Sequence, residues 1–231
     1  MRKIIVSLLI IALIALAGCT AGENTINVEG TSEITVDQDQ AEIWVGASIV
    51  DISADLAQNQ VNGIINDIID GLKTEGIPES DISTEQLSLY EERRWENGKS
   101  TVVGWRATQT LKVKTTELNK VGSIVDIAVN NGANQINSIN FGLSEEKEKE
   151  YKKQAIAAAT VNAKEKAETI ADSLGAELGS IRSVSESGFY YRPYAYAAAK
   201  TDAAEAAEEI AQVLPGDVTV TANINIVYNI K

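Results

Sequence analysis

The hydrophobic residues in the range 40–144 switch repeatedly between two spacings, and the order of these switches constrains the fold of the chain most. Apolar residues alternate with polar ones from Ala41 to Ile49, which is the spacing of a strand with one buried face. From Ala57 to Leu72 they recur every three or four positions, as on an amphipathic helix. Over the whole range the pattern predicts strand, helix, strand, strand, helix, strand. This is the order of a ferredoxin-like βαββαβ plait, an α+β fold with both helices on one sheet face.

Local signals mark the ends of several of these elements. Ser53 precedes the first helical pattern and predicts its N-cap. Asn97-Gly98 separates two strand patterns and tolerates positive φ at both central positions of a type I′ turn, so it predicts a β-hairpin. Asn131-Gly132 follows the second helical pattern and predicts its end.

Further strand and helix patterns lie on both sides of the predicted plait. Residues 25–39 alternate and, with the strand that follows, predict a β-strand pair, while two more strands are expected near 178–184 and 218–230. A long helix is expected after Ser144, with a stripe of mostly small residues at Ala155, Ala159, Ala163, Ala167, Ile170 and Leu174. We therefore expect the plait to be inserted in a discontinuous β-αββ subdomain of residues 25–39 and 145–231, which gives two helix-on-sheet layers.

A segment rich in tyrosine and alanine, residues 189–213, separates the last two expected strands. Its irregular pattern predicts a flexible surface loop. The alternative is a docking segment, because tyrosine combines a large contact area with a polar tip. Its candidate contact residues are Tyr190, Tyr191, Tyr194 and Tyr196.

Two tryptophans in the expected sheet have opposite relations to their strands. Trp44 falls between the alternating apolar residues of its strand, whereas Trp105 is in phase with the apolar residues of its own. Trp44 is therefore the better candidate for an exposed contact residue. Of the two environments open to Trp44 itself, however, the sequence favours burial on both sides, between helix layers, over exposure.

The first residues have the pattern of an export signal. Two basic residues precede an apolar run from Ile4 to Ala17, and the sequence Leu-Ala-Gly-Cys that ends at Cys19 resembles the lipobox of prokaryotic lipoproteins. We expect a signal peptide over residues 1–18, a lipid-modified Cys19 in a short linker over residues 19–24, and the lipid membrane as a partner. An uncut transmembrane anchor is the alternative, but a spanning helix needs about 20 apolar residues and this run is shorter.

The charge and the cysteine content of the chain exclude one class of partner and one means of stabilising the fold. The 231-residue chain has a formal net charge of −13, and removal of residues 1–18 takes away Arg2 and Lys3 and lowers it by two units, to −15. Such a charge repels phosphate backbones, so we expect no nucleic-acid partner. The single cysteine cannot form an internal disulfide, and the exported domain must rely on its hydrophobic core.

Few kinds of catalytic site are open to this composition. Histidine is absent, which excludes Ser-His, Cys-His and His-metal sites, and no phosphate-binding glycine motif occurs. A carboxylate pair remains, with Asp37 and Asp39 or Glu91 and Glu92 as candidates. The segment that starts at Asp37 also resembles the start of a calcium-binding loop, but the glycine and glutamate that such a loop needs do not follow. We expect no catalytic, cofactor-binding or metal-binding residues, and hence no cofactor.

Several short motifs of the chain, in their order, resemble the SIMPL-domain family, a domain of unknown function that includes periplasmic immunogenic and oxidative-stress-defence proteins. The motifs are Val28-Glu29-Gly30, Asp39 to Ile43, Gly76-Ile77, Asp81 to Thr84, Leu87 to Tyr90, Gly104 to Ala107, Leu111 to Val113, Gly132-Ala133, Ile139 to Ser144, Ala163 to Ala167, Leu174-Gly175 and Pro215-Gly216. Ser32 and Gln38 depart from the family pattern. The resemblance implies a two-part α/β fold over residues 25–231, a place in the cell envelope, a tendency to form ring-like homo-oligomers and a loose association with stress defence.

Together these features predict a non-catalytic lipoprotein, anchored in the cell membrane or outer membrane and facing the periplasm or exterior. It is expected to self-assemble and to act as a binding or scaffold protein, with a role in envelope or oxidative stress defence. A carboxylate-dependent envelope hydrolase is the alternative function.

Overall fold

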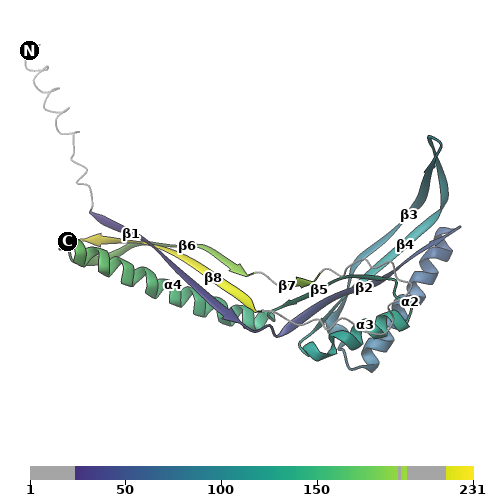
Figure 1. Ribbon diagram of the computed structural model, residues 1–231, viewed down its shortest axis with the longest axis horizontal. Coiled ribbons are helices and arrows are strands. Elements are labelled where there is room, and N and C mark those ends of the chain that lie inside the picture. The colour runs from purple at the N-terminus through teal and green to yellow at the C-terminus, as the bar shows by residue number, and fades with distance from the viewer. Residues whose placement is uncertain (1–23, 192–193, 197–216) are drawn as a thin grey trace, which may run out of the picture. The chain divides into compact units, whose positions relative to one another are not determined.

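The computed structural model describes residues 24–191, 194–196 and 217–231, and this part of the chain has an α+β fold with helices packed on two β-sheets (Figure 1). The strands are β1 (Thr25–Val36), β2 (Gln40–Asp51), β3 (Ile82–Glu96), β4 (Lys99–Thr115), β5 (Gln135–Gly142), β6 (Leu178–Tyr191), β7 (Tyr194–Tyr196) and β8 (Val218–Ile230). The helices are α2 (Ala54–Thr74), α3 (Val121–Asn130) and α4 (Glu145–Leu174), with 3-10 turns at Glu79–Asp81 and Leu118–Lys120. The predicted α+β class and the helix-on-sheet layers are confirmed.

Two compact units divide the described residues. One unit combines Ala157–Gly188 and Asn223–Lys231 with the described residues before Glu33, and the other combines Glu33–Ile156 with the described part of Phe189–Ala222. The second unit therefore includes the start of α4, whereas the sequence-based boundary lies at residue 144.

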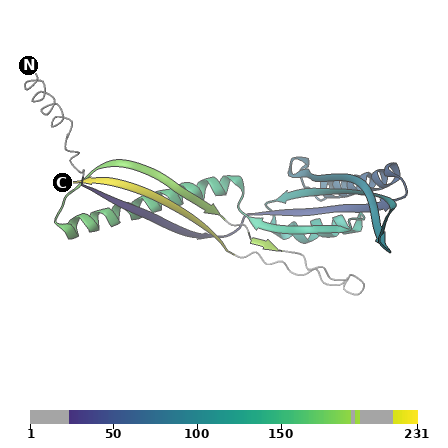
Figure 2. The ribbon, with the colours of Figure 1, turned by 90° about the horizontal axis from the view of Figure 1, so that it is seen from above.

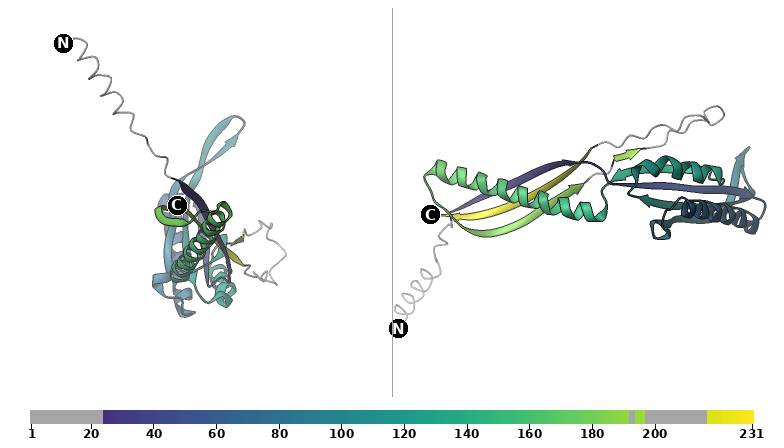
Figure 3. Two further views of the ribbon diagram at one scale, coloured as in Figure 1. Left: turned by 90° about the vertical axis from the view of Figure 1, so that its left-hand side faces the viewer. Right: turned by 90° about the horizontal axis from the view of Figure 1, so that it is seen from below.

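The five-stranded sheet has the order β3-β4-β2-β5-β7, and each pair of neighbouring strands is antiparallel. Between residues 40 and 144 its elements follow one another in the predicted order of strands and helices. Helices α2 and α3 lie on the same face of this sheet (Figures 1 and 3). The core between helices and sheet includes Ile43, Val45, Val61, Ile65, Ile68, Leu72, Leu111, Val113, Ile124 and Phe141.

Two local predictions in this unit are confirmed. The Ser53 side chain accepts a 3.2 Å hydrogen bond from the Leu56 N–H, as an N-cap does. Asn97 and Gly98 connect β3 to β4 with φ values of 50° and 75°, the left-handed conformation that the predicted hairpin turn requires. These ends fix the length of α2 and the register of the β3–β4 hairpin.

The three-stranded sheet has the order β1-β8-β6, and α4 runs along it (Figure 2). The buried stripe of α4 consists of Ala155, Ala159, Ala163, Ala167 and Ala171. Small residues let the helix approach closely: a methyl group on Gly30 of β1 would overlap the Ala159 carbonyl oxygen and come within 2.7 Å of the Ala163 Cβ. The stripe was predicted to end with Ile170 and Leu174, which is wrong, because these side chains are 40% and 68% exposed.

Two predictions about strands need correction. β1 and β2 do not form a pair, because they belong to different sheets. The loop predicted for residues 189–213 is wrong at its start: β6 continues to Tyr191, and Tyr194–Tyr196 form β7, which pairs with β5. The rest of that segment lies outside the described residues. β7 escaped prediction because a three-residue strand has no measurable periodicity.

Candidate functional site

The face of the five-stranded sheet opposite α2 and α3 carries mostly polar side chains. On β4, Ala107, Leu111 and Val113 point into the helix-covered core, while the alternate residues point to the other side. We call this side the open face. It includes Glu42, Trp44, Gly46, Ser48 and the exposed Val50 of β2, Gln86, Ser88, Tyr90 and Glu92 of β3, Arg106, Thr108, Thr110, Lys112 and Lys114 of β4, and Gln135, Asn137, Ser138 and Asn140 of β5.

A hollow of about 530 Å³ lies on the open face and spans four strands. It is lined by Ser48, Gln86, Ser88, Tyr90, Arg106, Thr108, Gln135 and Asn137. Each lining residue is polar or carries a polar tip, so the hollow suits a ligand that forms hydrogen bonds rather than an apolar one.

Arg106 lies at the centre of a hydrogen-bond network in this hollow. Its Nε donates to Glu92 Oε2 over 2.8 Å, and its Nη1 donates to Ser48 Oγ over 3.2 Å. The Ser48 hydroxyl in turn lies 2.8 Å from the Thr108 hydroxyl. The network joins β2, β3 and β4, and it therefore holds the guanidinium in one position on the sheet surface.

The charges of the open face are balanced by ion pairs. Besides Arg106 with Glu92 at 2.8 Å, Lys112 lies 3.5 Å from Glu85 and Lys114 lies 3.6 Å from Glu42. The hydrogen bond from Arg106 holds the pKa of Glu92 below its ordinary value, and the same bond raises the pKa of Arg106. Both groups are therefore charged at neutral pH and offset each other.

A second, smaller hollow of about 190 Å³ lies beside the end of β5 and includes Glu42, Lys114, Asn140 and Tyr191 among its lining residues. The Tyr191 hydroxyl accepts a 2.6 Å hydrogen bond from the Leu143 N–H. Burial raises the pKa of Tyr191, partly offset by this bond. Tyr191 thus holds the end of β6 against the end of β5, which is a structural role.

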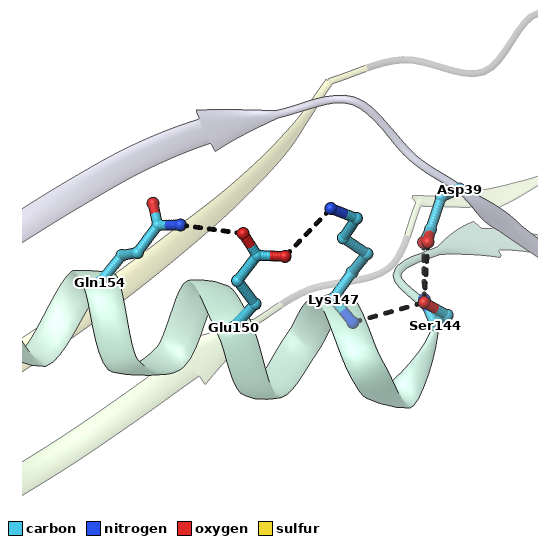
Figure 4. Close-up of polar contacts among 5 residues, drawn as sticks. All are labelled: Asp39, Ser144, Lys147, Glu150 and Gln154. Atoms are coloured by element: carbon cyan, nitrogen blue, oxygen red, sulfur yellow. Dashed lines mark hydrogen bonds and ion pairs between the residues drawn. The ribbon is translucent and has the colours of Figure 1, made fainter.

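The acidic candidates from the sequence do not form a catalytic pair. Asp39 accepts hydrogen bonds from the backbone N–H and the hydroxyl of Ser144, each 2.7 Å long, at the start of α4 (Figure 4). Asp37 is exposed. Glu91 and Glu92 are neighbours on a strand, so they point to opposite faces, and each forms its own ion pair, with Arg93 and Arg106.

The charged start of α4 behaves as an exposed helix surface. Lys147 and Glu150 form an ion pair of 3.0 Å, and Gln154 donates a 3.3 Å hydrogen bond to Glu150, at the spacings of one helix face (Figure 4). Over residues 24–191, 194–196 and 217–231, no group of histidine, cysteine and acidic residues could hold a metal ion. Within the same ranges no helix is long and apolar enough to cross a membrane.

The aromatic candidates lie in different places. Trp44 is half-buried on the open face, in register with Lys112 and Ser138, while Trp105 packs against the helix-covered core. Tyr190 is 59% exposed at the end of β6.

The remaining candidates are described in part or not at all. The backbones of Tyr194 and Tyr196 lie opposite Phe141 and Ile139. Cys19 and the predicted signal peptide lie outside the described residues.

Sequence reasoning missed several residues on the β3–β4 hairpin. Arg106 and Glu92 meet across the hairpin, and Tyr90 is half-exposed opposite Arg106. The one sequence signal that could have identified Arg106 is the alternation around Ala107, which puts Arg106 on the polar face of its strand. Trp95, near the turn of the hairpin, is 74% exposed, and Val102, which lies opposite Arg93, is 49% exposed.

The matches to known proteins extend over most of the residues that form this architecture. Residues 26–228 match the SIMPL family, described as proteins of unknown function (DUF541). The chain is 28% identical to the uncharacterized protein YggE of Escherichia coli K12 over 188 residues, which cover 79% of this chain and 76% of that protein. It is 31% identical to YggE of Edwardsiella ictaluri over 156 residues, covering 67% of this chain and 64% of that protein.

A third relative is a 26 kDa periplasmic immunogenic protein of Brucella melitensis, 28% identical over 166 residues, which cover 70% of this chain and 66% of that protein. The family match extends from the first residues of β1 almost to the end of β8, and so includes both sheets. This chain therefore belongs to the SIMPL family.

Proposed function

We propose that this protein is a lipoprotein of the cell envelope that binds a ligand on its open face and does not catalyse a reaction. The hollow around Arg106 supports this proposal most strongly. It is wide, polar and charge-balanced, and hydrogen bonds to Glu92 and Ser48 fix its central guanidinium. A preformed polar surface of this kind binds without large rearrangement.

The acids of the open face favour binding over hydrolysis. Glycoside hydrolysis needs two carboxyl groups that face each other across a substrate, with one of them held protonated. Glu42, Glu85 and Glu92 are instead each paired with a cation, and the pKa of Glu92 is lowered rather than raised. The carboxylate-dependent hydrolase is therefore the weaker alternative.

Anchoring through Cys19 is the second part of the proposal. The lipobox-like sequence and the periplasmic location in the name of the Brucella relative support an exported, lipid-anchored chain that faces the periplasm or exterior. Two acyl chains hold a protein on a membrane where one chain does not. With Cys19→Ala, metabolic labelling with a radioactive fatty acid should be lost. Unchanged labelling would contradict lipidation at this residue.

Self-assembly through the β6 edge of the three-stranded sheet is the third part. At the β1 edge, α4 side chains already bind backbone groups: Lys166 donates a 2.8 Å hydrogen bond to the Glu29 carbonyl oxygen, and Asn162 accepts one of 3.2 Å from the Thr31 N–H. β6 forms the other edge, and its Ile181 and Val184 side chains are 57% and 56% exposed. An edge strand with exposed apolar side chains favours pairing with another copy.

The native mass of the chain tests this third part. The wild type should give one oligomeric species, and Val184→Lys should give a smaller one, because a charge in the edge disfavours pairing. Val161→Lys, on α4 and 57% exposed, is the matched control. A wild-type monomer would contradict self-assembly.

Site-specific photo-cross-linking in cells tests the binding role of the open face. A photoreactive amino acid replaces Ser88, inside the hollow, or Leu87, which is its neighbour on the opposite side of β3 and is 62% exposed. Cross-linked material should form from position 88 well above the level from position 87. Equal yields from both positions would contradict a binding role for the open face.

A further inference from the structure

We infer that the hollow on the open face binds a neutral oligosaccharide, with Tyr90 stacking on a sugar ring and the surrounding amide and hydroxyl groups binding its hydroxyls. This inference rests on the proposed binding role and specifies the chemical class of the ligand. It follows from the free hydrogen-bonding groups, the balanced charge and the shape of the hollow.

The free hydrogen-bonding groups of the hollow are both donors and acceptors. Among the described residues, the side chains of Gln86, Ser88 and Gln135 form no hydrogen bond, and Asn137 uses only its Nδ2, in a 3.4 Å bond to Thr110 Oγ1. A carboxamide offers an NH₂ donor and a carbonyl acceptor side by side. A ligand with neighbouring hydroxyl groups, each of which donates and accepts, matches these groups.

The charge of the hollow disfavours an anionic ligand. Arg106 is the cation among the lining residues, and its guanidinium already binds the Glu92 carboxylate over 2.8 Å. An anion such as phosphate would have to displace Glu92 or leave it close to a like charge. The net charge of −13 adds a repulsive field around the whole chain. A neutral ligand avoids both costs.

An aromatic side chain in the lining of the hollow completes the match. Tyr90 is 50% exposed and lies opposite Arg106 in the strand register. An aromatic ring offers a flat apolar surface, which the C–H face of a sugar ring can cover while its hydroxyls point sideways to polar groups.

The extent of the hollow favours a chain over a single small molecule. The lining residues come from β3, β4, β2 and β5, which are neighbours in the sheet. Three interstrand spacings of about 4.8 Å give a breadth of roughly 14 Å, enough for a short oligosaccharide. An extended peptide would instead bind at a sheet edge, where unpaired backbone groups are available.

Isothermal titration of the full chain in detergent micelles tests the inference. The neutral probes are maltotriose, cellotriose and chitotriose, and the charged probes are inorganic phosphate and trigalacturonate. At least one neutral trisaccharide should bind saturably, and Tyr90→Ala should weaken its binding about tenfold. Tyr90→Phe, which keeps the ring, should stay within about threefold of the wild type.

Leu87→Ala is the matched control, because Leu87 lies on the same strand, points to the opposite side and is 62% exposed. Its affinity for the sugar should equal that of the wild type, and thermal melting of each variant shows that it is folded. Three results would each overturn the inference. They are that none of the three neutral trisaccharides binds saturably, that Tyr90→Ala leaves the affinity unchanged, or that phosphate or trigalacturonate binds more tightly than the neutral sugars. Cross-links from position 88 without sugar binding would overturn the inference that the ligand is an oligosaccharide. They would still support the proposed binding role of the open face.

Discussion

Asp39 and Ser144, which are 105 positions apart in the chain, are joined by two hydrogen bonds of 2.7 Å, from the Ser144 N–H and hydroxyl to the Asp39 carboxylate. The Ser144 hydroxyl also accepts a 3.4 Å hydrogen bond from the Lys147 N–H in the first turn of α4. Asp39 thus fixes the start of α4 next to the start of β2. The acid that the sequence offered as a candidate for catalysis or calcium binding has a structural role.

Replacing Asp39 by alanine should lower the free energy of unfolding by about 2 kcal/mol, because two hydrogen bonds to a charged group are lost. Asp37→Ala is the matched control, since Asp37 is exposed two positions earlier, and it should stay within about 0.5 kcal/mol of the wild type. Urea unfolding measures both values. Equal stabilities of the two variants would contradict the structural role of Asp39.

Replacing Gly30 by alanine should destabilise the protein by about 1 to 3 kcal/mol, because the added methyl group meets the Ala159 carbonyl oxygen and the Ala163 Cβ. Gly63→Ala is the control with the opposite expected sign. Apart from the neighbouring backbone of α2 itself, no atom lies within 4 Å of a Cβ at Gly63, in the interior of α2, and alanine should stabilise the helix by about 0.5 to 1 kcal/mol. Thermal melting measures both changes. A Gly30→Ala protein as stable as the wild type would show that α4 does not pack on β1 as described.

Replacing Tyr191 by phenylalanine should cost about 1 kcal/mol, because the Leu143 N–H loses its acceptor. Tyr190→Phe removes the same hydroxyl from an exposed neighbour and should leave stability unchanged. Chemical unfolding of the two variants side by side tests this difference. Indistinguishable midpoints would place the Tyr191 hydroxyl in solvent.

The ion pair of Arg106 with Glu92 should make stability depend on pH. In the folded protein the pKa of Glu92 is lowered from its ordinary value of 4.5. The contribution of Glu92 to stability is therefore present above pH 4.5 and is lost as the pH falls through the folded pKa. The melting temperature should therefore fall more for the wild type than for Glu92→Gln between about pH 6 and about pH 3. Glu33→Gln, at an exposed residue of β1, should follow the wild type. Parallel curves for wild type and Glu92→Gln would contradict an ion pair in solution.

The fold was predictable wherever a short segment carries its own signal. The Ser53 cap and the Asn97-Gly98 turn depend on residues next to each other, and the alternation of β2 and β8 follows from one buried face. β6 was harder to bound, because its described side chains are exposed or half-buried and show no alternation. The buried stripe of α4 continues with Ala171 rather than with the predicted Ile170, because the close packing of the helix on the sheet favours the smaller residue.

The candidate site was harder to predict, because it depends on strand register. Arg106 reaches Glu92 across the hairpin and Ser48 on a third strand, and no local pattern contains this information. Register shifts at Thr84/Gln86 on β3 and at Trp44/Val45 on β2 also break simple alternation. These shifts decide which side chains of β3 and β5 join the hollow.

Amide chemical-shift mapping of the isotope-labelled full chain, with and without the soluble glycan fraction of its own cell envelope, tests the central claim most directly. The perturbed amides should cluster around Ser48, Ser88 and Thr108 on the open face. Perturbations confined to the hairpin end around Trp95, or to β6 around Val184, would contradict it and would assign binding to another surface.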